Sequence, residues 1–289
     1  MEQIFNSEFY EKLNTLRMSI ALNLASGQAG GRKSNSKGNS VEFSDFREYI
    51  IGDDIRRIDW NAYGRFDKLF VKLFREEKEG VFNLFLDCSE SMNFGEHRKD
   101  VCAKRVAGAL SYIVLDNGDR LYLNLAKDND LTTAGGFSGM QSFVRCLKFL
   151  EDAPIGGSGS LMESLKDRNF KARGLSFVIT DGYMDNLEDM IKFLKYKHQD
   201  VVFIQILSDE ELNPSYEGNL RLIDSEFAFD SRVSFNANVI KQYKDSLREF
   251  LSSTENLCKK YGVTYIRINS SDSCDSIFFS ALAKLAKKV

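Results

Sequence analysis

Residues 81–91 read Val81-Phe82-Asn83-Leu84-Phe85-Leu86-Asp87-Cys88-Ser89-Glu90-Ser91. The first six are mostly apolar and contain no glycine or proline, which predicts a buried strand of a parallel sheet. Such sheets place ligand sites just beyond the carboxyl ends of their strands. Asp87, Ser89 and Ser91 offer three hard oxygens there, which suit Mg²⁺, with Mn²⁺ or Ca²⁺ as alternatives, better than zinc. A turn in which Asp87 or a serine caps the next helix is the other interpretation.

A second apolar run also ends in a carboxylate. Leu175-Ser176-Phe177-Val178-Ile179 is followed by Thr180-Asp181-Gly182. Because parallel strands end at the same edge of a sheet, we expect Asp181 to lie near Asp87. The second carboxylate favours a metal site over a helix cap.

The two loops together resemble the metal-ion-dependent adhesion site of von Willebrand factor A domains. That site has an Asp-x-Ser-x-Ser loop, a threonine loop and an aspartate loop, and the resemblance implies that Asp87, Ser89, Ser91 and Asp181 are ligands. The segment Gly156-Gly157-Ser158-Gly159-Ser160-Leu161 lies between them but contains no threonine. A serine hydroxyl can still bind a cation, so Ser158 and Ser160 are both candidates. Composition alone favours a flexible glycine and serine turn.

A long charged segment precedes the first loop. It contains Glu42-Phe43-Ser44-Asp45-Phe46-Arg47-Glu48-Tyr49, Gly52-Asp53-Asp54-Ile55-Arg56-Arg57-Ile58-Asp59-Trp60, Arg65, Leu69, Val71-Lys72, Phe74 and Glu77. These residues resemble the signature of the domain-of-unknown-function fifty-eight family. Members of that family are encoded beside MoxR-type AAA+ ATPases. The resemblance therefore implies an AAA+ partner and a chaperone-like task in assembly or remodelling.

The signature segment mixes both signs of charge, with eight basic and ten acidic residues between Glu42 and Glu79. This balance favours ion pairs or a protein-binding face over a phosphate-binding stripe. We expect its aspartates to order a tight turn and to pair with its arginines, although they are also candidate metal ligands. The residues in question are Asp53, Asp54, Asp59, Arg56, Arg57 and Arg65. Trp60 is expected to be a buried anchor, with partner contact as the alternative.

Composition narrows the class of protein. The chain has 289 residues, of which 43% are hydrophobic, and a net charge of −3, which gives no sign of nucleic-acid binding. Its five cysteines show no repeated spacing and fit reduced thiols, which favours a cytoplasmic location. Charged residues among the first 17 argue against a secretory signal, and we expect no membrane span.

The pattern along the chain predicts two parts. Residues 1–80 comprise a helix from Ser7 to about Ala25, a glycine- and serine-rich loop at 26–40 and the signature segment, which is expected to pack on the main domain. Residues 81–289 alternate strands and helices, which predicts a doubly wound, mostly parallel α/β sheet of the von Willebrand factor A type. A small β-rich insertion at about 213–238 interrupts the alternation.

Two classes of function fit this site. In a metal-dependent binding module, the cation keeps an open position that a carboxylate of a partner protein fills. In a metal-dependent hydrolase of the phosphatase type, a second acid is needed two residues after Asp87, and Ser89 stands there. His97 and His198 lie next to no recognisable nucleophile and are expected at the surface. The sequence therefore favours a non-enzymatic adaptor that binds a divalent cation and an acidic side chain of a partner. The family resemblance implies that this partner is a MoxR-type AAA+ ATPase, a client protein or both.

Overall fold

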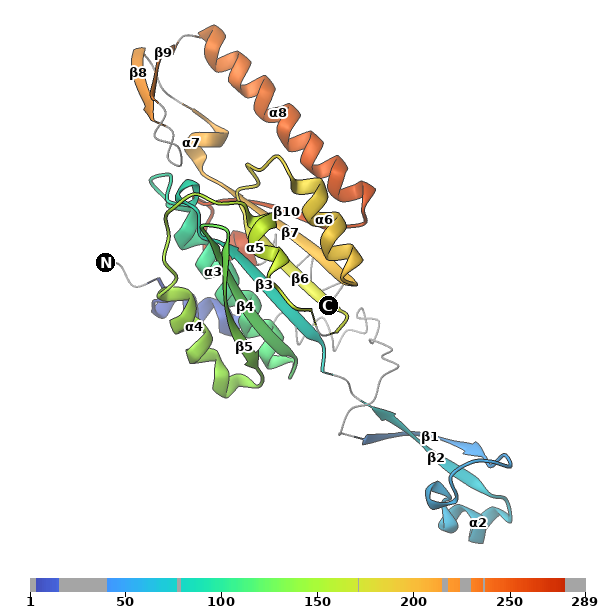
Figure 1. Cartoon of the computed structure of the whole chain (residues 1–289). Helices are drawn as coiled ribbons and strands as arrows, with labels where there is room; N and C mark the ends of the chain where they lie inside the picture. The colour runs from blue at the N-terminus through green and yellow to red at the C-terminus, as the bar shows by residue number, and fades with distance from the viewer. Residues whose placement is uncertain are drawn as a thin grey trace. The chain divides into compact units, whose positions relative to one another are not determined.

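The structure is a computed structural model that describes residues 4–15, 41–76, 79–170, 172–214, 218–223, 230–235 and 237–278. The chain forms two compact units (Figure 1). The main unit comprises Met1–Ala29 and Gly80–Val289, and the small unit comprises Gly30–Glu79. The packing of the signature segment on the main domain stays a prediction.

The main unit is built on a six-stranded sheet with the order β10-β7-β6-β3-β4-β5. The strands are β3 (Val81–Asp87), β4 (Arg120–Lys127), β5 (Asp130–Phe137), β6 (Gly174–Thr180), β7 (Gln199–Leu207) and β10 (Thr264–Asn269). All neighbours pair in parallel except β5, which forms an antiparallel hairpin with β4. The order reverses direction at β3 and β6, as in doubly wound folds. The predicted fold class is confirmed.

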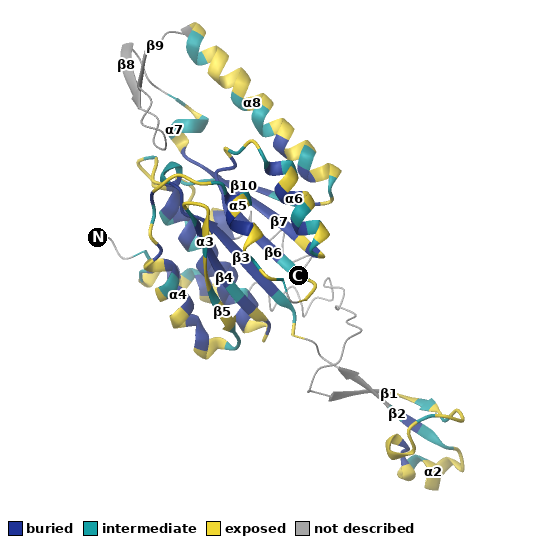
Figure 2. Ribbon diagram, in the orientation of Figure 1, coloured by how far each residue is buried: buried dark blue, intermediate teal, exposed yellow. Residues whose placement is uncertain are grey.

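Helices cover both faces of this sheet (Figures 1 and 2). The longer ones are α3 (Lys99–Asp116), α4 (Phe143–Glu151), α6 (Leu187–Tyr196) and α8 (Ala237–Lys260), and the shorter ones are α5 (Leu161–Lys166), α7 (Asp209–Leu212) and α9 (Cys274–Ser276). Alternate side chains of β3 serve the two faces, because successive side chains of a strand point in opposite directions. Leu84 packs in the core beneath α3 and α4, whereas Phe85 packs with α5 and α6.

The N-terminal segment belongs to the core of the main unit. Residues 7–15 are helical, and Phe5, Phe9 and Leu13 are buried. A Cβ atom on Gly108 of α3 would lie within 3.0 Å of both Phe5 and Phe9, so glycine is what allows this close approach. The predicted apolar stripe of the first helix is confirmed as far as residue 15. Residues 16–40, which include the predicted loop, lie outside the described part.

The small unit pairs β1 (Val41–Glu48) with β2 (Phe70–Glu76) in an antiparallel hairpin that carries α2 (Trp60–Phe66). Its aspartates act as predicted in part. Asp54 caps a short 3₁₀ turn (Ile55–Arg57) and pairs with Arg56, while Asp59 caps α2 and pairs with Lys72 instead of an arginine. These caps satisfy backbone N–H groups that the turns leave without partners.

The prediction that Trp60 is a buried anchor is wrong. Its side chain is 64% exposed within this unit, where it contacts Tyr63 edge to face. Ile51 and Phe66 are exposed as well. A hairpin with one short helix has too little interior to bury so many large apolar side chains.

The predicted insertion also contains strands. β8 (Gly218–Ile223) and β9 (Asp230–Phe235) form a separate antiparallel pair ahead of α8. The sequence also predicts a short strand at Glu226–Phe229, which lies outside the described residues. Within the described part of the chain, no helix combines the length and the apolar character that a bilayer crossing requires.

Candidate metal centre

The site lies where β3, β4 and β6 end at one edge of the sheet. Asp87 is the last residue of β3 and pairs in register with Ala126 of β4, and Thr180 is the last residue of β6. The N–H of Cys88 donates to the carbonyl of Ala126 (2.9 Å), which prolongs the ladder past the strand end. Parallel pairing therefore brings the two carboxylate loops together, as the sequence predicted.

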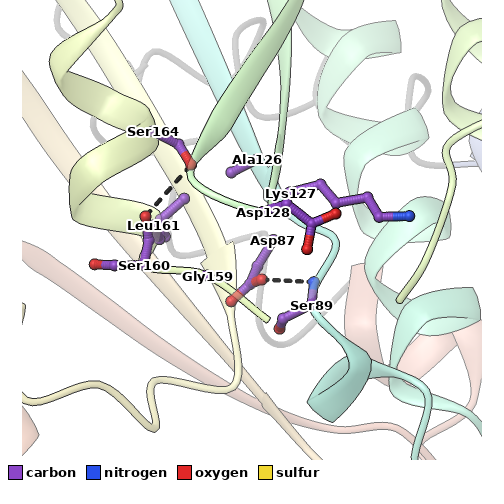
Figure 3. Close-up of a pocket in the computed structure, with 9 residues that line it drawn as sticks. All are labelled: Asp87, Ser89, Ala126, Lys127, Asp128, Gly159, Ser160, Leu161 and Ser164. Carbon is purple, nitrogen blue, oxygen red and sulfur yellow. Dashed lines mark hydrogen bonds between the residues drawn. The ribbon is translucent and has the colours of Figure 1, made fainter. Parts of the chain in front are cut away.

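The carboxylate of Asp87 is buried and accepts two hydrogen bonds. Thr180 Oγ1 donates to its Oδ2 (2.6 Å) and the N–H of Ser89 donates to its Oδ1 (3.0 Å; Figure 3). Burial is the main cause that raises the pKa of Asp87, and the nearby charge of Asp181 raises it further. A cation beside Asp87 would relieve both effects.

The two serines of the first loop face each other. Ser89 Oγ lies 3.0 Å from Ser91 Oγ, and Ser89 is buried while Ser91 is partly exposed. Ser89 is the N-cap of the 3₁₀ turn Glu90–Met92, which contains Ser91. Hydroxyls in this arrangement can bind one cation together with Asp87.

The middle loop is fastened to the first loop by its backbone. Gly156 N–H donates to the carbonyl of Cys88 (2.9 Å), and Glu90 N–H donates to the carbonyl of Gly157 (3.0 Å). Gly157 has a φ of +84°, and a Cβ there would lie 2.1 Å from Asp128 Oδ1, so only glycine fits. The middle loop therefore has one fixed backbone path beside Asp87.

The two candidate serines of this loop differ in position. Ser160 stands at the start of α5, lines the cavity described below, and accepts a hydrogen bond from Asn186 Nδ2 (2.9 Å). Ser158 is exposed, and its N–H donates to Asp128 Oδ1 (3.1 Å). The geometry thus places Ser160 closer to the role of a ligand, while the backbone of Ser158 holds the loop.

Asp181 has an unexpected partner. Its Oδ2 accepts a hydrogen bond from Lys99 Nζ (2.9 Å), and its Oδ1 accepts one from the N–H of Tyr183 (3.2 Å). Lys99 Nζ also donates to Glu211 Oε1 (2.8 Å), and the lysine side chain is only 1% exposed. Asp181 therefore belongs to an ion-pair network as well as to the carboxyl edge of the sheet.

A small cavity of about 10 Å³ opens beside Asp87, enough for one water-sized occupant (Figure 3). It is lined by Asp87, Ser89, Ala126, Lys127, Asp128, Gly159, Ser160, Leu161 and Ser164. The donors on these residues are hard oxygens, which fit Mg²⁺. Among the described residues no group of three or more His, Cys, Asp or Glu side chains is placed to hold a metal, so hydroxyls and water would have to complete its coordination.

The roles of three residues at this edge were not predicted from the sequence. Thr180 holds Asp87, Lys99 holds Asp181, and Asp128 holds the middle loop. For Lys99 a signal existed: a cation at the first position of a helix opposes the helix dipole unless acids compensate it. Asp128 and Asn129 read as an ordinary hairpin turn, and both have positive φ angles.

Cys88 and the two histidines differ in their burial. Cys88 is fully buried, and burial raises the pKa of its thiol to about 12, which leaves it protonated at neutral pH. His97 and His198 are both exposed, as the sequence suggested.

Comparisons with known proteins bear on the family and on the fold. A family model described as protein of unknown function DUF58 matches residues 45–250. The uncharacterized protein Mb1516 of Mycobacterium bovis is 25% identical over 225 residues, which cover 74% of this chain and 70% of the relative. Among solved structures, the conserved hypothetical protein BatB from Bacteroides thetaiotaomicron has 16% identity and a TM-score of 0.43, with 72% of this chain and 99% of BatB covered. The VWA domain of SpRpn10 has 12% identity and a TM-score of 0.40, with 70% of this chain and 94% of that domain covered.

Proposed function

Because the chain belongs to the DUF58 family and folds as a doubly wound α/β sheet, we propose that it is a metal-dependent adaptor of the von Willebrand factor A type that binds other proteins. The observation that carries the proposal is the buried Asp87 carboxylate with Ser89 and Ser91 at the carboxyl edge of the sheet. A Mg²⁺ ion would be held by these three side chains and by Ser160, with Ser158 as the other candidate of the middle loop and Asp181 acting directly or through water. Mn²⁺ and Ca²⁺ offer the same preference for oxygen.

Such an ion would be left with an open position. The protein contributes a few oxygens from one side, because the loops approach the ion from the edge of the sheet only. Water or a carboxylate of a partner protein would complete the coordination from the solvent side. A carboxylate that replaces water on a partly desolvated cation gains a charge-assisted contact, which makes the ion part of the binding surface.

The partner we propose is a MoxR-type AAA+ ATPase, which works with the adaptor in chaperone-like assembly or remodelling. This proposal rests on the resemblance of the signature segment, whose turns are ordered by Asp54 and Asp59. An acidic side chain of the ATPase or of its client would reach the cation. A cytoplasmic location agrees with the reduced cysteines and with the need to meet an ATPase.

Removing the cation is expected to release the partner. In a pull-down of a co-encoded AAA+ ATPase, EDTA should reduce capture about tenfold or more, since the contact that the ion mediates is lost. Replacing Ser89 with alanine should weaken capture in the presence of Mg²⁺, because one ligand is gone. Ser253 on α8, whose hydroxyl donates to the carbonyl of Phe250, provides a control serine away from this edge. If the amount of captured ATPase changes neither with EDTA nor with Ser89→Ala, the metal has no part in binding the partner.

We further propose that the protein is not an enzyme. Hydrolysis of phosphate esters by an aspartate would need an acid two residues further on, and that position holds Ser89. Purified protein with Mg²⁺ is therefore expected to release no phosphate from p-nitrophenyl phosphate or from ATP. Metal-dependent turnover that disappears in Asp87→Asn would instead identify a hydrolase.

A further inference from the structure

Among the described residues of the main unit, Lys99 carries a buried ammonium group. This residue begins α3, and its side chain is only 1% exposed. Its Nζ lies 2.9 Å from Asp181 Oδ2 and 2.8 Å from Glu211 Oε1, and 5.6 Å from the centre of the Tyr183 ring. A buried ammonium is costly unless it is paired, and here two carboxylates and an aromatic face surround it.

The two carboxylates have different surroundings. Asp181 belongs to the loop that follows β6, next to Thr180, whose hydroxyl holds Asp87. Glu211 belongs to α7, where its Oε2 accepts the N–H of Ser208 (2.7 Å) in a capping box. Lys99 therefore pairs with two carboxylates at once. Asp181 lies beside the proposed cation site, whereas the capping box of α7 holds Glu211 in place.

The charges at this edge determine how Lys99 affects the attraction of a cation to the site. Asp87, Asp181 and Glu211 carry three negative charges when ionised, and Lys99 carries one positive charge. The lysine therefore cancels part of the attraction that a divalent cation would feel. It also occupies Oδ2 of Asp181, an oxygen that a cation would otherwise find available.

We propose that Lys99 is an internal competitor that sets the cation affinity of this site by holding Asp181. The inference rests on the proposed function, because it assumes a cation beside Asp87. When the cation draws on Asp181, Glu211 keeps the ammonium paired, so the buried positive charge never stands alone. Lys99 is thus a positioning residue that acts through Asp181. It lowers the affinity of the site for the cation, so the cation binds only when a partner or a high free cation concentration favours the bound state.

The test is isothermal titration of wild type and Lys99→Met with Mg²⁺ and with Mn²⁺. Methionine keeps an unbranched chain of similar length and removes the charge. We expect the variant to bind the cation about tenfold more tightly or better, because repulsion and competition are both lost. We also expect its melting temperature without metal to be lower and the rise on adding metal to be larger, because Asp181 and Glu211 lose their counter-charge. If Lys99 were only structural, its replacement would lower the melting temperature without tightening the binding of the cation.

Each outcome of the titration is decisive. Tighter binding by Lys99→Met supports the inference, and so does binding by the variant when wild type shows none. Equal or weaker binding by the variant, with clear binding by wild type, overturns the inference and leaves the proposed function standing. Absence of binding in both proteins overturns the inference and the metal-dependent function together.

A second pair of variants answers the question if Lys99→Met does not fold. Glu211→Gln removes the alternative partner of Lys99, so the ammonium should hold Asp181 more firmly and weaken cation binding about fivefold or more. Glu210→Gln removes the same charge from the same helix, but Glu210 accepts its hydrogen bond from the N–H of Glu96 (2.8 Å). Weaker binding in Glu211→Gln than in Glu210→Gln supports the competition. Equal binding in the two variants overturns it.

Discussion

Asp87→Asn is expected to reduce Mg²⁺ and Mn²⁺ binding about 100-fold or more, which in a calorimetric titration means loss of detectable heat. Asp87 is the one carboxylate that ends β3 between the first loop and Thr180, and in the proposed site it carries the charge that the ion needs. Asparagine keeps the shape and one oxygen but removes that charge. Without metal the variant should melt at the same temperature as wild type or higher, since a buried negative charge near Asp181 is removed.

Asp119→Asn is the matched control for this experiment. Asp119 and Asp87 are equally exposed, at 8%, and each accepts a backbone N–H, from Gly80 (2.6 Å) in the case of Asp119. Asp119 precedes β4 and so lies at the opposite, amino edge of the parallel strands. Its replacement should leave cation binding unchanged. Equal heats from wild type and Asp87→Asn would show that the cation, if bound, sits elsewhere.

Phe9→Ala is expected to lower the free energy of unfolding by about 3–5 kcal/mol, the usual cost of removing a fully buried phenylalanine. Phe9 is 1% exposed and packs between Phe5 (ring centroids 5.0 Å apart) and Phe278 (6.0 Å), over Gly108 of α3. The cavity would therefore open where the N-terminal helix meets the main unit. Denaturant unfolding followed by circular dichroism measures the change.

Tyr10→Ala provides the comparison from the next position of the same helix. Tyr10 is 43% exposed and meets Phe9 only edge to face. Its loss should cost less than about 1 kcal/mol, as for most surface substitutions. If the two variants were equally stable, the N-terminal helix would contribute nothing to the core in solution.

The sheet and the first loop could be predicted because their signals are local. An apolar run that ends in Asp87 or Asp181 marks a strand and its carboxyl end, and parallel pairing then places both acids at one edge. The choice between Ser158 and Ser160 could not be made, because a glycine-rich loop has no periodicity that fixes the direction of its side chains. Here Asp128 and Asn129, from a distant hairpin turn, decide the path of the loop.

Two other features escaped prediction for different physical reasons. Lys99 meets Asp181 and Glu211 across 82 and 112 residues of sequence, so no local pattern connects them. Trp60 was expected to be buried because large aromatic side chains usually are. Burial depends on the size of the unit that holds the residue, and a tryptophan in a two-stranded unit has little interior available.

The order of the two units along the chain has a topological consequence. Phe5 and Phe9 share one hydrophobic core with Phe82, although the whole of the small unit lies between them in sequence. The small unit is therefore inserted in sequence between two pieces of one domain, and none of its described residues belongs to that core. Because the two units have separate cores, a change inside the small unit is expected to leave the six-stranded sheet as it is.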